Sequence, residues 1–393
     1  MSGTIAPADE AGIARAVAEA TAPVAIEGSG TTLGMLRPVQ AARTISTRNL
    51  TGITLHRPQE LVIAARAGTP LPEIEAALAE HDQVLIAEPP DLRGLLGTAD
   101  RPPPTIGGLV AANLSGPRRI AGTALRDNVL GLRFVNGTGE VLRAGGRVHK
   151  NVTGLDLCKL LAGSHGTLGI ITEVTLKVAP AAERTATLVV PVDGTAAGVS
   201  VLSAGLTSPY GVTGAALVTE GLEAAGIAGP AALLRLEDVA SSVAYRTGRL
   251  RAALPGVSRI LEGEESRAAW RAIRDATALA PAEGEAVWRL SLRPSAAHAA
   301  AAALRAAFPA RLLLDWGGGL VWVSGPATEA AHRVVMAAAS GGTFTLFRAP
   351  DALRAALPVI PEEPAALARL SARVKASLDP AGRLNPGRMR AGL

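Results

Sequence analysis

The stretch Arg126-Asp-Asn-Val-Leu-Gly-Leu-Arg-Phe-Val-Asn-Gly137 predicts a β-strand at Val129–Val135 that ends in an Asn-Gly turn. Asn-Gly favours a hairpin because both residues accept positive φ, so we expect a second strand at Glu140–Arg143. A second stretch, Gly163-Ser-His-Gly-Thr-Leu-Gly-Ile-Ile-Thr-Glu-Val-Thr175, leads through a glycine turn into a β-rich run from Thr167 to Val178. This part of the chain is therefore expected to consist of short strands joined by glycine loops.

Further elements are expected around these stretches. Asp9 can cap a helix that runs through Ala20. The run Arg101-Pro-Pro-Pro-Thr105 must be extended, because proline is excluded from a helix interior. The other elements expected before residue 180 are strands at Val24–Gly28, Gly52–Leu55, Leu61–Ala65 and Val84–Ala87, and helices at Leu71–Glu80 and Gly154–Ala162.

Aromatic residues separate this region from the next one, since Phe134 is the only one before residue 200. The second region repeats the element order β-α-β-β-α-β on either side of a helix at Glu264–Ala278. Two such split βαβ units predict an antiparallel sheet with helices on one face. The expected segments are Thr185–Val190, Ala196–Ala204, Ala215–Val218, Ala231–Glu237, Val239–Ala253 and Ser258–Leu261, then Ala286–Arg293, Ser295–Ala307, Leu312–Trp316, Leu320–Ser324, Ala327–Ala339 and Thr343–Phe347.

The tail is expected to differ from both regions. After Pro350 we expect a short helix, a longer one at Pro364–Leu378, and an irregular run Asp379-Pro-Ala-Gly-Arg-Leu-Asn-Pro-Gly387. A chain of 393 residues is long enough for two or three domains. We therefore expect domains at residues 1–180 and 181–348, followed by a C-terminal segment at 349–393.

Composition excludes several classes of protein. Apolar residues make up 48% and charged residues 19% of the chain, which is typical of a globular protein and excludes wholesale disorder. One cysteine, Cys158, cannot form an internal disulfide or ligate an iron–sulfur cluster alone, so the reducing cytoplasm is the expected compartment. The net charge of +5 is spread out, with no basic stripe interleaved with aromatics, so no nucleic-acid partner is expected. No long uncharged apolar run or signal peptide is recognised, and any membrane association is expected through partners only.

The loop Gly28-Ser-Gly-Thr-Thr-Leu-Gly34 is the first candidate binding element. It fails as a dinucleotide fingerprint, because the third glycine is one place late and Pro38 interrupts the helix that should follow. Its backbone N–H groups and the hydroxyls of Ser29, Thr31 and Thr32 could still hold an anion such as a pyrophosphate. Taken alone, an ordinary turn between strands is an equal alternative.

Three other segments combine glycines with hydroxyl or amide side chains. They are Thr105–Gly116, Gly122–Val129 and Gly163–Thr172. In each of them glycine permits positive φ or a close backbone approach, while the polar neighbour supplies a hydrogen bond. Such recurrence favours a long phosphate-containing ligand that lies across several loops.

These motifs, together with Gly145-Gly-Arg-Val-His-Lys-Asn-Val-Thr-Gly-Leu-Asp156, resemble the flavin-binding domain of the vanillyl-alcohol oxidase family. With the terminal Asp379–Gly387 run, the chain most resembles the smaller FAD-binding subunits of bacterial glycolate oxidases. The resemblance implies an α+β fold: a two-subdomain FAD-binding domain of the PCMH type, plus a cap domain whose antiparallel sheet is made of split βαβ units.

The resemblance also implies FAD contacts. It places the pyrophosphate on the Gly28–Gly34 loop and further contacts on the other glycine segments and on Asn385. It also implies that the C-terminal segment at 349–393 returns to the first domain. For Gly154 and Asp156, a capping and packing role is as plausible as ligand contact. The implied cofactor-binding residues are Gly28, Ser29, Gly30, Thr31, Thr32, Thr105, Ile106, Gly107, Gly108, Ser115, Gly116, Arg126, Asp127, Gly166, Thr167, Gly169, Ile170, Ile171 and Asn385.

Departures from the family pattern limit what can be transferred. The first loop contains no His or Cys, so we expect noncovalent FAD. Relatives that oxidise 2-hydroxy acids carry a His-x-His metal pair, whereas no two of the six histidines here lie within four residues of each other. No metal site is therefore expected, and the catalytic residues are not identified. The six are His56, His81, His149, His165, His298 and His332.

Several single residues have a simpler structural alternative. His165 could act near the flavin phosphate, but a variable position in the turn is favoured two to one, and His149 and Lys150 could be solvated loop residues. Cys158 is best explained as a buried apolar residue. Trp288, Trp316 and Trp322 are expected to pack in the core rather than to form a substrate platform.

The resemblance implies a function and its partners. The chain is expected to be a subunit of a complex that oxidises a small 2-hydroxy acid, glycolate, to glyoxylate, with a larger FAD-binding subunit and an iron–sulfur subunit as partners. Flavin supplies the redox chemistry and the protein tunes it. Two alternatives remain: a self-sufficient flavin dehydrogenase for another alcohol or hydroxy acid, and a non-catalytic subunit whose flavin is structural or an electron relay.

Overall fold

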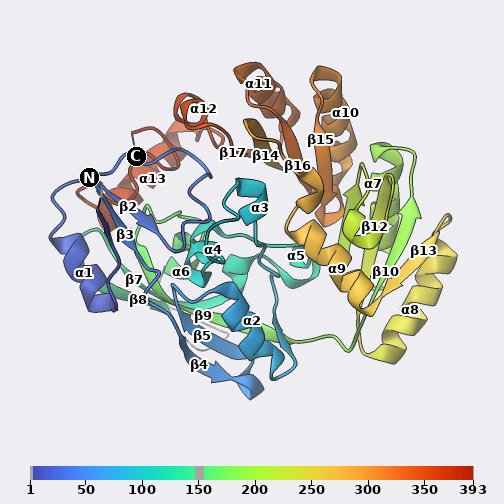
Figure 1. Ribbon diagram of the computed structural model, residues 1–393, viewed down its shortest axis with the longest axis horizontal. Coiled ribbons are helices and arrows are strands. Elements are labelled where there is room, and N and C mark those ends of the chain that lie inside the picture. Colours follow the sequence, from blue (N-terminus) through green and yellow to red (C-terminus); the bar gives the residue numbers. More distant parts are fainter. Residues whose placement is uncertain (1–2, 147–154, 393) are drawn as a thin grey trace. The chain divides into compact units, whose positions relative to one another are not determined.

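The computed structural model describes residues 3–146 and 155–392. Contacts divide the chain into two compact units (Figure 1). Unit 1 comprises Met1–Ser115, Ala124–Ala181 and Glu362–Leu393, and unit 2 comprises Gly116–Thr123 and Ala182–Pro361. Residues 116–123 group with unit 2, which no sequence pattern indicated. The domain boundaries expected at residues 180 and 348 stay a prediction.

Unit 1 contains two sheets. The smaller is parallel, in the order β1 (Gly3–Ile5), β3 (Arg43–Ser46) and β2 (Val24–Glu27). The larger is antiparallel, in the order β4-β5-β9-β7-β8, and β6 pairs with β9. Its strands are β4 (Ile53–Arg57), β5 (Val62–Arg66), β6 (Gln83–Leu85), β7 (Val129–Val135), β8 (Val141–Gly145) and β9 (Ile170–Pro180).

Short helices connect these strands. Helix α1 (Glu10–Ala18) begins at Asp9, whose carboxylate accepts a hydrogen bond from the Gly12 N–H at 2.6 Å, so the expected cap is confirmed. The other helices of unit 1 are α2 (Leu71–Ala79), α3 (Arg93–Leu96), α4 (Ile106–Ala112), α6 (Leu157–Leu161) and α13 (Ala365–Leu378).

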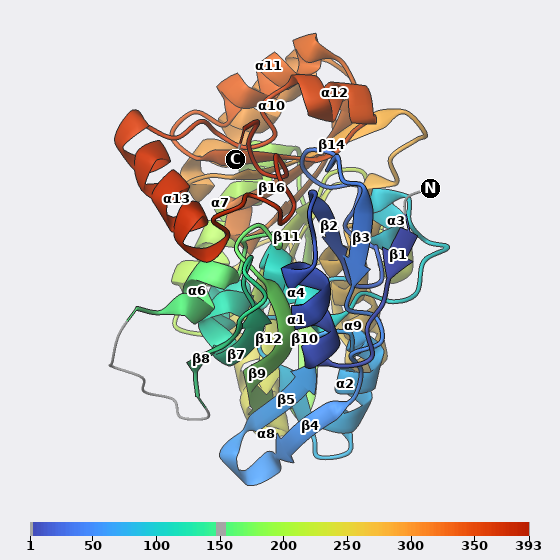
Figure 2. The same cartoon turned by 90° about the vertical axis from the view of Figure 1, so that its left-hand side faces the viewer.

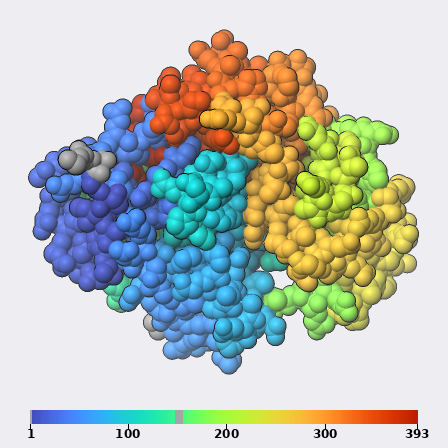
Figure 3. Space-filling view, in the orientation of Figure 1, coloured from blue at the N-terminus to red at the C-terminus, as the bar shows by residue number. Residues whose placement is uncertain are grey.

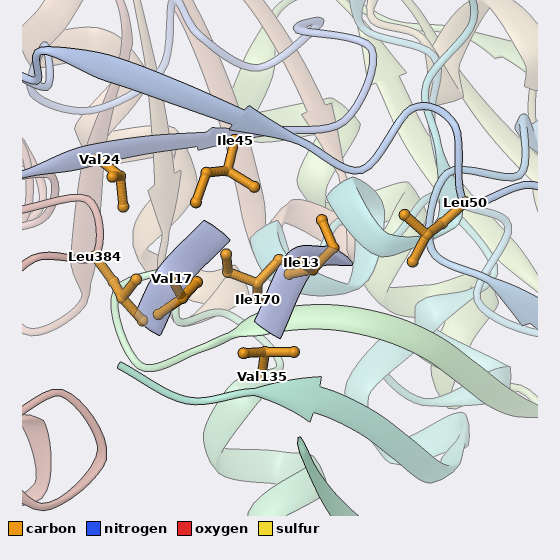
Figure 4. Close-up of a cluster of buried hydrophobic side chains, with 8 residues drawn as sticks. All are labelled: Ile13, Val17, Val24, Ile45, Leu50, Val135, Ile170 and Leu384. Carbon is orange, nitrogen blue, oxygen red and sulfur yellow. The ribbon is translucent and has the colours of Figure 1, made fainter. Parts of the chain in front are cut away.

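One apolar cluster joins the two sheets of unit 1 (Figure 4). Helix α1 contributes two buried side chains, β2 and β3 contribute one each from the small sheet, and β7 and β9 contribute one each from the large sheet. Leu384 of the tail is fully buried in the same cluster. The complete set is Ile13, Val17, Val24, Ile45, Leu50, Val135, Ile170 and Leu384. The tail is thus part of the core of unit 1.

The tail lies beside β2 (Figure 2). Val24 and Leu384 form a parallel bridge, in which the Val24 N–H donates to the Arg383 carbonyl at 2.9 Å. Buried Lys375 on α13 donates to the Asp379 carboxylate at 2.6 Å and to the Leu384 carbonyl at 3.0 Å. These bonds fix the irregular run after α13 without regular secondary structure.

Unit 2 is built around one eight-stranded sheet, in the order β13-β10-β12-β11-β15-β16-β14-β17. All its pairings are antiparallel. The first repeat is β10 (Arg184–Pro191), α7 (Thr195–Thr207), β11 (Gly214–Val218), β12 (Ala231–Asp238), α8 (Ala240–Ala253) and β13 (Arg259–Glu262), and the second is β14 (Glu285–Ser291), α10 (Ala297–Ala307), β15 (Arg311–Asp315), β16 (Leu320–Pro326), α11 (Glu329–Ala338) and β17 (Thr343–Arg348).

The two repeats have the same topology. Numbered within each repeat, the strands lie in the order 4-1-3-2, and the second strands of the two repeats, β11 and β15, pair at the centre. Their helices pack on one face, where Gly198 of α7 lies against Leu217, and Trp288 donates its indole N–H to His332 of α11 at 3.0 Å. Outside the repeats lie α5 (Arg119–Gly122), α9 (Gly263–Arg274) and α12 (Asp351–Ala356).

The expected fold class is confirmed: the chain is α+β, with two sheets in unit 1 and an antiparallel sheet of two split βαβ units in unit 2. Helix α4 begins at Ile106, directly after the extended Arg101–Thr105 run, and was not expected. Strands β1 and β3 were not expected. Expectations for His149, Lys150 and Gly154 lie outside the described residues.

The first prediction concerns the buried tail. We expect Leu384→Ala to lower the free energy of unfolding by about 2–5 kcal/mol, because it leaves a cavity in a fully buried site. Leu367→Ala on α13 removes the same atoms from a side chain that is 53% exposed, so it should change stability by under about 0.5 kcal/mol. Urea unfolding of both variants checks this, and equal effects would contradict the role given to the tail.

Candidate functional site

A pocket in unit 1 is formed where β2, α4, the glycine turn before β9 and the C-terminal tail meet. Most of its walls are backbone or small side chains, which suits a ligand that approaches the main chain closely. Its lining residues are Ile26, Glu27, Gly28, Gly30, Thr32, Leu33, Thr47, Gly107, Gly108, Ala111, Ala112, His165, Gly166, Gly169, Ile170, Ile171, Asn385 and Arg388.

The loop after β2 is tightly apposed to α4. A Cβ on Gly28 would lie 2.3 Å from Thr105 Oγ1, so only glycine fits there. Gly30 has φ of +78°, and a Cβ on it would meet the guanidinium of Arg101 at 2.6 Å. Arg101 is exposed and follows α3, whose segment lies in cyan on the face that Figure 3 shows. Backbone N–H groups and a cation therefore meet at this loop.

Two buried hydroxyls at the same junction lack a partner. Ser29 Oγ and Thr105 Oγ1 make no hydrogen bond with any residue that the structure describes. A buried hydroxyl without a partner is costly, so such groups are expected to bind a ligand or water. Their place between the β2 loop and α4 fits a phosphate-containing group held by hydroxyls and main-chain N–H groups.

Asn385 connects two walls of the pocket. Its Oδ1 accepts from the Ile26 N–H of β2 at 2.8 Å, and its Nδ2 donates to the His165 carbonyl of the glycine turn at 2.8 Å. A Cβ on Gly166 would lie 2.9 Å from that same Nδ2, so glycine is needed beside the bridge. The side-chain amide thus sets the distance between β2 and the turn.

Two basic residues of the tail hold the loops through main-chain carbonyls. Arg388 donates to the carbonyls of Thr32 at 2.7 Å and Arg37 at 3.0 Å, which fixes the loop after β2. Lys375 donates to the Thr167 carbonyl at 2.7 Å, which fixes the glycine turn. Arg388 also lines the pocket, so its positive charge favours an anionic ligand.

His165 lines the pocket from a strained position. Its φ is +51°, its N–H donates to the Ala111 carbonyl at 2.9 Å, and its side chain is partly buried. Burial, with a smaller effect from the Arg388 charge, lowers the pKa of His165 to about 3. The imidazole is therefore neutral at physiological pH and can serve as a hydrogen-bonding group without adding charge.

Glu27 brings a carboxyl group into the same pocket at the end of β2. Burial raises its pKa, while the charges of Arg101 and Arg48 oppose the shift. A carboxylate is an acceptor for hydroxyl groups. The pocket thus combines an acceptor at Glu27 with donors at the loop and at Arg388.

The structure brings ten of the nineteen sequence-derived residues together around this pocket. They come from all four walls. These ten are Gly28, Gly30, Thr32, Gly107, Gly108, Gly166, Gly169, Ile170, Ile171 and Asn385. Ser29 and Thr105 lie in the adjoining junction, as described above.

The remaining candidates have structural roles or lie elsewhere. Ser115 Oγ accepts from the Leu125 N–H at 2.9 Å, and the Asp127 carboxylate accepts from the Ala124 N–H at 3.3 Å. Thr167 Oγ1 donates to the Ser164 carbonyl at 2.7 Å. Arg126 is exposed, and its N–H donates to Asn113 at 3.1 Å. The others are Thr31 and Ile106, which are buried, and Gly116, which groups with unit 2.

Sequence reasoning missed Glu27, Thr47 and Arg388. Arg388 stands three places after Asn385 and directly after the terminal Asp379–Gly387 run, and that proximity was the available clue. Glu27 is the last residue of β2, and Thr47 directly follows β3. Nothing in their local sequence marks either of them as a pocket residue.

Other expectations can be compared with the structure directly. Among residues 3–146 and 155–392 there is no group of three or more His, Cys, Asp or Glu side chains that could hold a metal ion. Cys158 is buried, and burial raises its pKa to about 11. Within those ranges, no helix combines the length and apolar character needed to cross a membrane.

The second prediction uses the neutral His165. The unfolded chain takes up a proton at this residue near its ordinary pKa of 6.5, and the folded chain only near 3, so folding stability falls as pH drops from about 6.5 toward 3. We expect His165→Asn, which tolerates positive φ, to reduce this slope by up to about 1.4 kcal/mol per pH unit between pH 6 and 4.

Urea unfolding of the apoprotein at several pH values measures that slope. His165→Gly should flatten it equally, because the two variants share only the loss of the imidazole. An unchanged slope in both variants would contradict the buried neutral state.

Known proteins resemble this chain in sequence and in fold. A family described as "FAD binding domain" matches residues 1–145. The glycolate oxidase subunit GlcE of Escherichia coli (strain K12) is 35% identical over 373 residues, which cover 94% of this chain and 93% of that protein. A D-lactate dehydrogenase of Archaeoglobus fulgidus is 30% identical over 174 residues, covering 44% of this chain and 37% of that protein.

A solved structure of the 4-ethylphenol oxidase from Gulosibacter chungangensis matches the fold with a TM-score of 0.73 at 13% identity, over 99% of this chain and 90% of that one. This likeness concerns the fold alone. FAD is the cofactor indicated by the family match, and the pocket described above fits its phosphates. The chain belongs to the family of the glycolate oxidase subunit GlcE, a branch of the FAD-linked oxidoreductases with the vanillyl-alcohol oxidase type of fold.

Proposed function

We propose that this chain is the FAD-binding subunit of a complex that oxidises glycolate to glyoxylate and passes the electrons to a partner subunit or acceptor. The observation that supports this most is the 35% identity to a glycolate oxidase subunit along 94% of the chain. An arrangement of orphaned hydroxyls, glycines and a tail arginine around one pocket is consistent with that role.

FAD, when bound, supplies the two-electron chemistry. The chain's own residues would bind and orient it. Ser29 and Thr105 offer hydroxyl donors, and Arg388 offers positive charge beside the loop after β2. Asn385 keeps β2 and the glycine turn at a fixed separation. We propose noncovalent binding, because the loop at residues 28–34 contains no His or Cys.

Partners follow from the proposed electron path. A single cysteine cannot ligate an iron–sulfur cluster, so onward transfer requires another chain or a soluble acceptor. We propose a larger FAD-binding subunit and an iron–sulfur subunit, by likeness to the glycolate oxidase relatives. The cytoplasm remains the proposed compartment.

The third prediction tests the pocket by charge. A Cβ on Gly108 has only Thr105 Oγ1 within 4 Å, at 3.4 Å, so a side chain can be added there with little steric conflict. We expect Gly108→Asp to weaken FAD binding at least about 10-fold, which corresponds to about 1.4 kcal/mol, because a carboxylate would face the phosphates. Gly108→Asn adds nearly the same volume without charge and is the matched control.

Equilibrium titration of apoprotein with FAD, followed by flavin fluorescence, measures both affinities. Equal affinities for the Asp and Asn variants would contradict phosphate binding at α4. Gly169→Asp is a poorer test, because its Cβ would lie 2.8 Å from the Phe134 ring and would disturb packing.

The fourth prediction tests the reaction. We expect the purified complex to show flavin absorption that bleaches when glycolate is added anaerobically, and we expect Gly108→Asp in this subunit to lower glycolate turnover as flavin is lost. Full turnover after loss of FAD from this subunit alone would contradict a role in the reaction. Bleaching of the isolated chain would instead favour a self-sufficient dehydrogenase.

A further inference from the structure

An arginine of unit 2 lies between two indole rings. The guanidinium carbon of Arg289 is 5.1 Å from the ring centroid of Trp316 and 5.8 Å from that of Trp322. Such cation–π contacts hold the guanidinium plane, but they do not neutralise its charge. The chemistry of this group therefore depends on what lies at its polar edge.

Arg289 is unusual because no carboxylate pairs with it. It makes no hydrogen bond or ion pair with any residue in the described ranges 3–146 and 155–392. Arg235 provides a comparison within the same sheet: its guanidinium lies 4.6 Å from the Trp270 ring, and its Nε is 3.2 Å from the Glu237 carboxylate. Arg235 thus has the carboxylate partner that Arg289 lacks.

Two other charged groups act on Arg289. Burial and the nearby charge of Arg119 lower its pKa to about 10, and the Asp315 carboxylate opposes this shift from beyond ion-pair distance. The guanidinium is still protonated at neutral pH. A partly buried cation beside a second cation is stabilised when an anion binds between them.

The sheet presents Arg289 on the face away from the repeat helices. Trp288, its neighbour on β14, points to the opposite face and hydrogen-bonds His332 of α11. Directly across the strands, Arg289 is paired with Trp322 of β16 and Thr345 of β17. Arg289 is partly exposed.

Trp316 is held in a strained conformation beside this arginine. Its φ of +54° is rare for a bulky residue. The Asp315 carboxylate accepts from its backbone N–H at 2.7 Å, and its indole N–H donates to the Gly116 carbonyl at 3.0 Å. The guanidinium carbon of Arg119 lies 4.4 Å from the centroid of the same Trp316 ring. Strain retained at such a position favours a functional role.

We propose that Arg289 anchors a binding site for a small carboxylate in unit 2. The planar fork of a guanidinium matches the two oxygens of a carboxylate, and the flanking indoles leave the edge of the guanidinium as its free binding surface. Glycolate is chosen as the probe because of the function proposed above, and the assignment of an anion site stands on the geometry alone.

Binding is measured on the full-length chain by the intrinsic fluorescence of its tryptophans, two of which flank Arg289. Sodium glycolate is titrated at constant ionic strength, with glycolamide as an uncharged analogue and inorganic phosphate as a tetrahedral anion. We expect a saturable response to glycolate, and at least 10-fold weaker responses to glycolamide and to phosphate. Tighter binding of phosphate than of glycolate would overturn the carboxylate assignment.

Variants locate the response. Arg289→Gln should weaken glycolate binding at least 10-fold, and Arg289→Lys should restore part of it. Arg293→Gln removes the same charge from an exposed arginine just beyond β14 and should have no effect. Wild-type affinity in Arg289→Gln, or equal loss in both Gln variants, would overturn the proposal, and calorimetric titration provides a readout that does not depend on indole emission.

The same experiment separates this proposal from the function proposed above. Glycolate binding should persist in Gly108→Asp, whose flavin is lost but whose unit 2 is unchanged. Arg289-dependent binding in a complex that fails to oxidise glycolate would leave the site standing and remove the proposed function. Glycolate turnover without Arg289-dependent binding would support the proposed function and remove the carboxylate site.

Discussion

The amide of Asn385 is the interaction on which the first unit depends. Its side chain accepts a hydrogen bond from Ile26 of β2 and donates one to His165 of the glycine turn. One planar group therefore sets the spacing of two pocket walls whose bonded residues are about 140 positions apart in the sequence. Its backbone N–H also donates to the Val24 carbonyl at 3.0 Å. A buried amide with both ends satisfied allows little sliding. The glycines around it are needed because the bridge draws the main chains together.

The charges of the tail act mainly through backbone carbonyls. Lys375 reaches the carbonyls of Thr167 and Leu384, and Arg388 reaches that of Thr32. Each cation thereby helps to organise a loop, and the buried Asp379 carboxylate balances Lys375. Arg289 in unit 2 contrasts with both, because aromatic rings rather than hydrogen bonds hold it. The chain thus uses cations in two ways, as hydrogen-bond donors to the main chain and as a charge held against aromatic rings.

The sequence predicts the fold well where local patterns control it. The Asn136-Gly137 hairpin, the Asp9 cap and the repeated strand–helix order of unit 2 are all present. Helix α4 was missed because two glycines follow three prolines at its start, which disfavours helix by propensity. Strands β1 and β3 depend on parallel pairing between distant segments. Arg388 could not be inferred, because its partners are carbonyls, which every residue has.

The return of the tail to unit 1 affects how this protein is made. Synthesis proceeds from the N-terminus, and domains generally fold as units when their segments have left the ribosome. Here the first unit includes Leu384, Asn385 and Arg388, so its core and pocket cannot be complete until unit 2 has been translated. Cofactor capture at the complete pocket is therefore a late event in the life of the nascent chain.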